Sequence, residues 1–148
     1  ERLLEVTEAA FRWFRLQLQT GAAAGARDYL TRRGLDRESE ERFGIGFAPD
    51  SRHALTRALR DKGFDDALIA ESGMAIAPDD GGALYDRFRG RIIFPIHDAR
   101  GRVIAFGGRA MDPDARAKYL NSPETPLFDK GRNLYHVGPA RAAVAARW

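Results

Sequence analysis

The chain has 148 residues, 44% of them hydrophobic and 30% charged, which excludes a disordered chain, and no apolar run reaches the roughly 20 residues of a membrane helix. It has no cysteine and no signal-peptide pattern at its start, so disulfides and thiolate metal sites are excluded and we expect a soluble, cytoplasmic protein with no membrane partner. The net charge is −3 over residues 1–84 and +6 over residues 85–148, which suggests a polyanion-binding face, although a solvated mixed-charge surface gives the same numbers.

The first half of the chain shows helical patterns. Apolar residues at spacings of three and four predict an amphipathic helix over residues 1–20. Shorter helices should follow, with boundaries marked by the cap residues Gly34, Asp36, Ser51, Gly63 and Gly73. Residues 1–77 are therefore predicted to be mainly helical.

The second half has strand patterns over residues 78–138. The runs R-I-I-F-P-I and R-V-I-A-F-G-G predict an antiparallel hairpin with its turn at residues 98–101. Pro95 cannot donate to a ladder, so its strand should lie at an edge or have a bulge there. The run N-L-Y-H-V is a possible further strand, and residues 139–148 look like the start of a helix that continues in a longer protein. The predicted fold class is α+β, a helical half followed by a small antiparallel sheet with a basic face.

No catalytic set is recognisable in the sequence. The close acidic pairs of the second half, Asp79–Asp80 and Asp112–Asp114, are typical of turns, and the three histidines have no sequence partners. We therefore expect no catalytic residue and no metal ligand in this chain.

The basic residues after residue 85 fit a phosphate-rich ligand. If R-F-R-G-R is extended, Arg87, Arg89 and Arg91 point to one face and Phe88 packs on the other. Arg109 follows a glycine pair, residues 107–108, which we expect to be flexible. Solvated arginines on a hairpin remain an equal alternative for Arg87, Arg100, Arg102 and Arg116.

The segment K-Y-L-N-S-P-E-T-P-L-F-D-K-G, residues 118–131, predicts a rigid loop. Its two prolines exclude a long helix or a central strand. The chain has only three lysines, and Lys118 and Lys130 bracket this loop. With Tyr119 as a ring to stack on a base, these lysines give the combination that single-stranded nucleic acid binding requires.

Two longer runs carry a family resemblance. Y-D-R-F-R-G-R-I-I-F-P-I-H-D-A-R-G-R-V-I-A-F-G-G-R and K-Y-L-N-S-P-E-T-P-L-F-D-K-G-R-N-L-Y, with the earlier E-R-F-G-I-G-F-A-P, resemble the N-terminal subdomain of the RNA polymerase core of bacterial DnaG-type primases. The resemblance covers nearly the whole chain, so residues 1–148 would form this subdomain. It implies that residues 139–148 lead into a Toprim subdomain whose carboxylates hold Mg or Mn, and that zinc belongs to a preceding domain; this chain contains neither domain.

The resemblance implies a function and a set of residues. Such primases make short RNA primers from nucleoside triphosphates on single-stranded DNA and work with the replicative helicase, which would bind regions absent here; the chain alone would be inactive. By motif position, template and nucleotide binding would fall to Arg42, Arg109, Lys118, Tyr119, Asn121 and Lys130. Further phosphate contacts would come from Arg87, Arg89, Arg91 and Arg132. One departure is His97, at a position where the family commonly has a basic residue.

Two other functions remain open at this stage. One is a non-catalytic single-stranded nucleic-acid-binding module of a phage or plasmid replication protein. The other is a structural scaffold whose arginines only keep it soluble.

Overall fold

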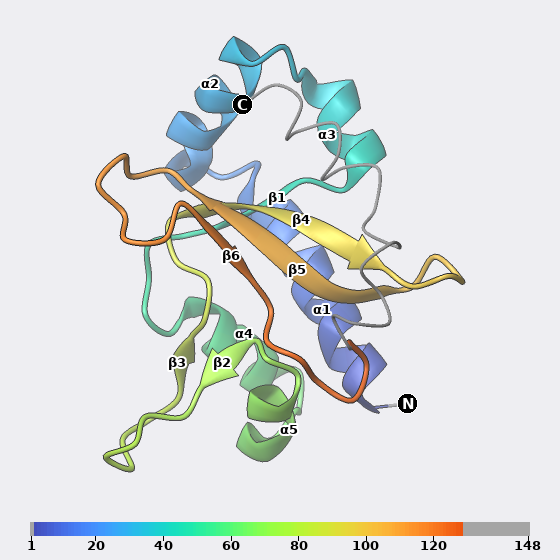
Figure 1. The fold of residues 1–148 in the computed structure, drawn as a ribbon, viewed down its shortest axis with the longest axis vertical. Coiled ribbons are helices and arrows are strands. Elements are labelled where there is room, and N and C mark those ends of the chain that lie inside the picture. Colours follow the sequence, from blue (N-terminus) through green and yellow to red (C-terminus); the bar gives the residue numbers. More distant parts are fainter. Residues whose placement is uncertain (1, 129–148) are drawn as a thin grey trace.

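The computed structural model describes residues 2–128, which fold around a four-stranded antiparallel sheet (Figure 1). The helices are α1 (Arg2–Gln17), the short 3₁₀ helix η1 (Gly21–Ala23), α2 (Ala24–Arg32), α3 (Arg37–Phe43), α4 (Ala54–Asp61) and α5 (Asp66–Glu71). The strands are β1 (Gly46–Ala48), β2 (Ala75–Ile76), β3 (Tyr85–Asp86), β4 (Arg91–His97), β5 (Val103–Ala110) and β6 (Tyr119–Asn121). None of the helices in residues 2–128 is long and apolar enough to cross a membrane.

The main sheet has the strand order β1-β4-β5-β6, and its centre is the β4–β5 hairpin. The hairpin turns at Asp98, whose backbone carbonyl accepts a hydrogen bond from the Gly101 N–H at 3.0 Å. Strand β1 pairs with the first three residues of β4, and β6 pairs with the last part of β5. A separate two-stranded sheet is formed by β2 and β3.

Helix α1 covers one face of the main sheet and passes behind it in Figure 1. The Phe14 ring lies edge-on to Phe106 of β5 at 5.2 Å and to Phe88 at 6.3 Å between ring centroids. All three rings are buried. Each such side chain contributes roughly 1.5–3 kcal/mol of hydrophobic free energy, so this contact is a main attachment of the helix to the sheet.

The opposite face of the main sheet is partly covered by α2 and α3, drawn above the sheet in Figure 1. Leu30 of α2 and Leu35 pack in one cluster with Phe47 of β1 and with Ile92 and Phe94 of β4. The ring of Tyr119 packs against the same cluster. This face therefore combines an apolar floor with the side chains of the β6 edge.

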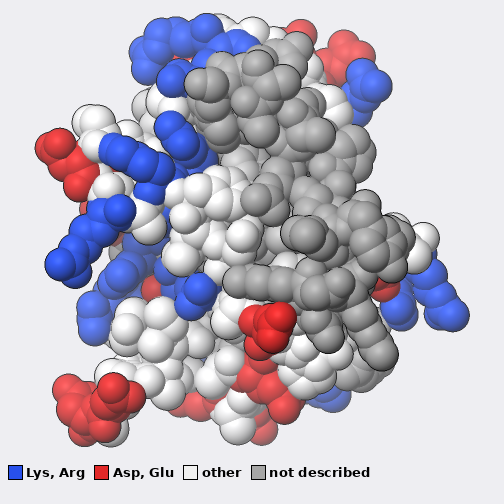
Figure 2. Space-filling view, viewed as in Figure 1, with Lys and Arg blue, Asp and Glu red and all other residues white. Residues whose placement is uncertain are grey.

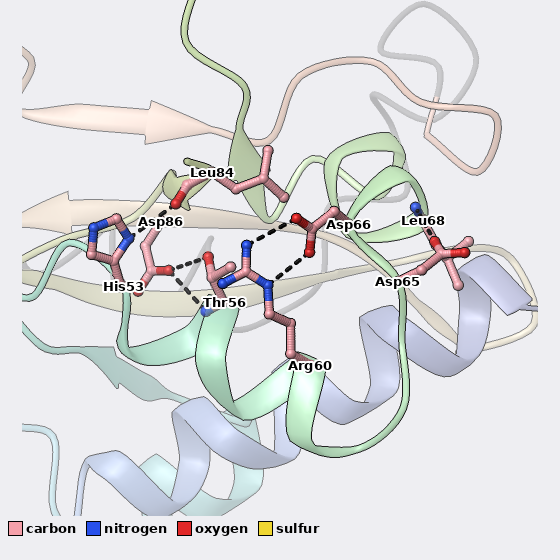
Figure 3. Close-up of polar contacts among 8 residues, drawn as sticks. All are labelled: His53, Thr56, Arg60, Asp65, Asp66, Leu68, Leu84 and Asp86. Carbon is pink, nitrogen blue, oxygen red and sulfur yellow. Dashed lines mark hydrogen bonds and ion pairs between the residues drawn. The ribbon is translucent and has the colours of Figure 1, made fainter. Parts of the chain in front are cut away.

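Helices α4 and α5 lie with the β2–β3 sheet below the main sheet (Figure 1). Asp86 of β3 joins them to it, because its buried carboxylate accepts hydrogen bonds from the Leu55 N–H at 2.8 Å and the Thr56 N–H at 2.9 Å. The Thr56 hydroxyl donates a third at 2.6 Å, and the His53 ring pairs with the Leu84 carbonyl at 2.9 Å (Figure 3). A residue far along the chain thus caps the start of α4.

The predicted α+β class and the five helical stretches are confirmed, as is the β4–β5 hairpin. Three expectations need correction. Ser51 was expected to be the cap of α4, but the N-cap position is His53, and Ser51 accepts only from the Ala54 N–H at 3.2 Å. Strand β1 lies within residues 1–77, for which the sequence predicts mainly helices and no strand. The loop predicted over residues 118–131 begins with an edge strand, β6.

Pro95 was expected in an edge strand or at a bulge, and the structure places it next to a bulge but not in an edge strand. The N–H and C=O of its partner Phe106 bond to Ser122, so the Pro95 nitrogen faces the β1 side of β4. Strand β1 reaches only Ile93, and the register shifts between Ile96 and His97. Pro95 is therefore in an interior strand, but at a position beyond the end of the pairing with β1 and next to a bulge, so its missing N–H leaves no ladder bond unmade.

Candidate nucleic-acid interface

Arg109, Tyr119 and Asn121 lie on one face of the main sheet. Arg109 is opposite Tyr119 in the β5–β6 register, and Asn121 is opposite Gly107 two residues away. Because side chains two residues apart in a strand point to the same face, the register brings these three predicted residues together. All three residues are half-buried, although the Tyr119 hydroxyl oxygen and the Asn121 Oδ1 atom are themselves buried.

Tyr119 is held by the sheet beneath it. Its ring stacks on Phe94 with centroids 5.7 Å apart and planes 15° from parallel. It also crosses Gly107, where an added Cβ would be 1.9 Å from the Tyr119 hydroxyl oxygen. A side chain at position 107 would displace the ring, so glycine is required there for the tyrosine to lie flat.

The second glycine of the pair serves the other face. A Cβ at Gly108 would be 2.9 Å from Phe88 and 3.0 Å from the Arg91 side chain. Both glycines are buried within β5, and neither has a positive φ. The expected flexibility of this pair is wrong: the glycines allow close packing on both sides of a regular strand.

Asn121 is fixed through its backbone. Arg87 donates from Nε at 3.1 Å and from Nη2 at 2.8 Å to the Asn121 carbonyl. This carbonyl is on the outer edge of β6, where no further strand of the described chain pairs. The Asn121 Oδ1 atom is buried and makes no hydrogen bond within the described residues, so it is a buried acceptor whose hydrogen bond is not made there.

The end of the interface is anchored by the residues after β6. The Ser122 Oγ accepts from the Phe106 N–H at 3.0 Å, and the Ser122 N–H returns a bond to the Phe106 carbonyl at 2.8 Å. Pro123 packs closely on Gly73, where a Cβ would be 2.9 Å from its Cδ. The Thr125 hydroxyl accepts from the backbone of the following turn. The S-P-E-T sequence therefore fixes the position of β6.

The three arginines of R-F-R-G-R have different environments. Residues 87–90 are not a regular strand, although Phe88 does pack inward as expected. Arg91 donates to the Gly108 carbonyl at 3.2 Å, and burial lowers the pKa of both Arg87 and Arg91 below the ordinary value of an arginine. Arg89 is exposed. The segment is thus not the extended strand on which a shared face of three arginines depended: Arg87 and Arg91 donate to backbone carbonyls, and Arg89 faces solvent.

Lys118 and Arg42 are exposed, as is Arg89. The Lys118 carbonyl accepts from the Ala110 N–H at 2.8 Å, which places this lysine directly before β6. Among residues 2–128, no carboxylate forms an ion pair with either side chain. Arg42 is at the end of α3, with its guanidinium 5.4 Å from the Phe43 ring centroid. Lys130 and Arg132 lie outside the described residues, as do the N-L-Y-H-V run and residues 139–148.

Basic side chains gather at one edge of the molecule. Figure 2 shows them along the left side, from the loop between β5 and β6 down to the segment around β3, while acidic side chains are most frequent at the bottom. The visible middle of the sheet is mostly uncharged. Lys and Arg side chains also lie at the top over α2 and at the hairpin turn on the right, so positive charge is not confined to the edge near β3 and β6, and a basic sheet face stays a prediction.

The described residues offer no metal centre. Among residues 2–128, no three His, Asp or Glu side chains lie close enough together to hold an ion. His97 is half-buried near the end of β4, where burial lowers its pKa. We therefore assign neither a metal ligand nor an acid–base role to the described part of the chain.

A family model described as the N-terminal domain of the DNA primase catalytic core matches residues 13–141. The chain belongs to this primase family. The DNA primase of Halalkalibacterium halodurans is 44% identical over 146 residues, which are 97% of this chain and 24% of the relative. The DNA primase of Neisseria meningitidis serogroup A is 49% identical over 128 residues, 86% of this chain and 20% of the relative. The chain thus spans a quarter or less of these relatives.

Solved primase structures have the same fold. A DnaG primase catalytic domain bound to ssDNA is 42% identical with a TM-score of 0.79, covering 89% of this chain and 40% of that one. The RNA polymerase domain of Mycobacterium tuberculosis DnaG, with a double-stranded DNA oligomer that has a 6-nucleotide overhang, is 39% identical with a TM-score of 0.81. That match covers 87% of this chain and 40% of the other. The α+β primase-core fold expected from the sequence is therefore confirmed.

Sequence reasoning missed the residues that support the interface. Phe94 stacks on Tyr119 in the structure, but in the sequence it is one apolar residue of R-I-I-F-P-I, and nothing in that run indicates this contact. Asp86 stands in Y-D-R-F, where an acid before an arginine looks like surface charge, but it is buried. A buried cap shows only when α4 and β3 are brought together, so no local signal could have identified it.

Proposed function

We propose that this chain forms the template- and nucleotide-holding part of a DNA primase that makes short RNA primers on single-stranded DNA. The observation that carries the proposal is the grouping of Arg109, Tyr119 and Asn121 on one sheet face, beside Lys118, in a chain of the primase-core family. Phosphate contacts position a nucleic acid strand, and cations with an aromatic ring are the usual means in sites for single strands.

Each residue has a role that fits its surroundings. Lys118 is exposed and free of ion pairs among the described residues, so it would meet a template phosphate or a triphosphate. Arg109 would provide a second cation from β5. The edge of the Tyr119 ring would orient a sugar or base, because one face of the ring is taken by Phe94. The buried Asn121 Oδ1 would accept a hydrogen bond from a nucleotide N–H or O–H group.

The other predicted participants belong to the same proposal. Arg42 and Arg89 are exposed and would add phosphate contacts, and Lys130 and Arg132 would extend the site beyond the described residues. Arg87 and Arg91 would support the interface instead, a role that fits the hydrogen bonds that they donate to backbone carbonyls.

The chemical step would take place elsewhere in a complete primase. We propose that Mg or Mn held by a Toprim subdomain provides nucleotidyl transfer, that zinc is bound in a preceding domain, and that the replicative helicase binds other regions. A cytoplasmic location follows from the same role in replication. The residues of this chain would bind and orient, and the chain alone would make no primer.

Named relatives support the primase over a stand-alone binding module. Both solved relatives described above are complexes with DNA, one with single-stranded DNA and one with double-stranded DNA that has an overhang. The curated relatives cited above are named as DNA primases. Nothing observed here favours the phage or plasmid binding module.

The test is substitution of the exposed lysine in the complete protein. Lys118→Ala should abolish primer synthesis while leaving the melting temperature nearly unchanged, because the side chain makes no contact within the described fold that folding depends on. Lys62→Ala is the matched control: it removes an exposed lysine next to α4 and should prime normally. Normal priming by Lys118→Ala would contradict the assignment, and loss of folding would make Lys118 structural.

A further inference from the structure

The outer side of α1 lines an open apolar groove. The groove has a volume of about 530 Å³, and Phe64, shortly after α4, forms part of its other wall. Trp13 lines it and is half-buried, and Leu16 lines it and is 67% exposed. Leu16 is the one exposed large hydrophobic side chain among residues 2–128. This side of the helix therefore presents apolar surface that the described fold does not cover.

One row of α1 side chains in the groove has the same pattern in both directions. The row consists of four residues at i, i+4 spacing that all line the groove: Leu4, Glu8, Arg12 and Leu16. Residues four apart lie on one face of a helix, about 6 Å from one to the next. Each end of this α1 row is a leucine, and its middle is an acid followed by a base. Turned end for end, the row sets each acid against a base and each leucine against a leucine.

The two charges in the middle of the α1 row are available to other partners. Arg12 Nε is 3.3 Å from a Glu8 carboxylate oxygen, but the Glu8 side chain is 46% exposed and the Arg12 side chain 75%. An ion pair this exposed contributes little to the stability of a fold. Both groups can therefore form ion pairs across an interface at little cost to α1.

We propose that the α1 groove is a self-association surface, on which α1 of a second copy of this chain packs antiparallel to α1 of the first. In this arrangement Leu4 contacts Leu16 of the second copy and Glu8 contacts its Arg12, and two-fold symmetry repeats each contact. Rows of i, i+4 residues pack side by side in the commonest class of helix pairs. A parallel pair would instead set Glu8 against Glu8, so the charges favour the antiparallel orientation.

The inference goes beyond the proposed function and does not depend on it. Helix α1 covers one face of the main sheet (Figure 1), whereas Tyr119 packs with Phe94 on the other face. Two copies joined through α1 would therefore leave both Tyr119 faces uncovered. Each copy could bind nucleic acid while it remained in the pair.

The expected association is weak. A single pair of helices buries less than the roughly 1,200 Å² of a stable interface, so we expect a dissociation constant on the order of 10⁻⁵ to 10⁻⁴ M. The measurement is sedimentation equilibrium of the 148-residue chain, from about 5 µM to about 1 mM so that the range brackets this constant. The expected result is a shift from monomer to dimer with rising concentration. A monomer throughout this range would overturn the inference.

Two charge reversals test the antiparallel pairing. Glu8→Arg and Arg12→Glu each set like charges against each other at two places, so each variant alone should associate about tenfold more weakly, or less. An equal mixture of the two variants should form a heterodimer about as readily as the unmodified chain pairs with itself, because every facing pair is again opposite in sign. No recovery in the mixture would overturn the proposed pairing.

The apolar contact and the effect of net charge have their own variants. Leu16→Ala should weaken association about tenfold, because the symmetry repeats the truncation, and its exposed position should leave folding intact by circular dichroism. The matched control is Arg37→Glu, which breaks an equivalent i, i+4 ion pair with Glu41 on α3, across the sheet from α1. The control should associate like the unmodified chain. Unchanged association of Leu16→Ala would overturn the inference, as would an equal loss in Arg37→Glu, because net charge alone would then explain the effect.

Discussion

Asp86 is the residue on which the lower half of the fold depends most. Its carboxylate is 3% exposed and accepts two backbone N–H bonds at the start of α4 and one from the Thr56 hydroxyl, which is itself in a fully buried residue. We predict that Asp86→Ala strongly lowers the free energy of unfolding. No other acceptor in the described residues bonds to those three donors.

The expected magnitude follows from the three contacts. A buried donor left without its acceptor costs about 1–3 kcal/mol, and the two N–H groups together with the hydroxyl give about 3–5 kcal/mol once some water enters the space. A whole domain has only about 5–15 kcal/mol, so the variant should unfold at a much lower urea concentration. Asp86→Asn keeps one oxygen acceptor and should lose about 1–2 kcal/mol.

The assay is urea unfolding followed by tryptophan fluorescence, since Trp13 packs edge-on to Phe14 at 5.7 Å in the core between α1 and the sheet. Asp79→Ala, an exposed acid in the β2–β3 loop, is the control and should change the free energy of unfolding by less than about 0.5 kcal/mol. A loss below about 1 kcal/mol for Asp86→Ala would refute the reasoning that α4 depends on this cap.

Three further predictions concern single side chains. Gly107→Ala should displace the Tyr119 ring and weaken DNA binding more than it lowers stability, measured by anisotropy and thermal unfolding; unchanged binding would show that the ring position is unimportant. Burial raises the pKa of Glu40 from 4.5 despite nearby arginines, so ionisation of this carboxyl costs stability as the pH rises. Glu40→Gln should therefore raise the melting temperature near pH 8 and give no gain at about pH 4. A gain in melting temperature at low pH would contradict this direction. Arg87→Met should loosen β6 and speed hydrogen exchange of the neighbouring Ser122 amide, which donates to the Phe106 carbonyl at 2.8 Å, about tenfold; unchanged exchange would show that Arg87 does not hold β6 in place.

Local signals in the sequence predicted much of this fold. Gly34, Gly63 and Gly73 follow their helices with positive φ, as expected of residues that end a helix. Asp36 caps α3 by accepting from the Ser39 N–H at 2.9 Å. In each case the deciding contact lies within four residues of the cap, so the sequence contains both partners. The hairpin was equally readable, because its turn and its two apolar runs are contiguous.

Contacts between distant segments could not be predicted in this way. Strand β1 has three residues and exists because β4 pairs with it more than forty residues later in the chain. The exposed look of Arg87 was misleading, since its acceptor is a carbonyl 34 residues away. The family motif identified Arg109, Tyr119 and Asn121 as a set, and the β5–β6 register supplied the reason they meet.

The most direct test of the central claim is the affinity of the 148-residue chain for single-stranded DNA across a salt series. If Arg109 and Lys118 both bind phosphates, the plot of log K against log salt should have a slope of about −1.4 or steeper, and Lys118→Ala should make this slope shallower by about 0.7. No binding at about 50 mM salt, or an identical slope for Lys118→Ala, would contradict a template-holding interface at β5 and β6.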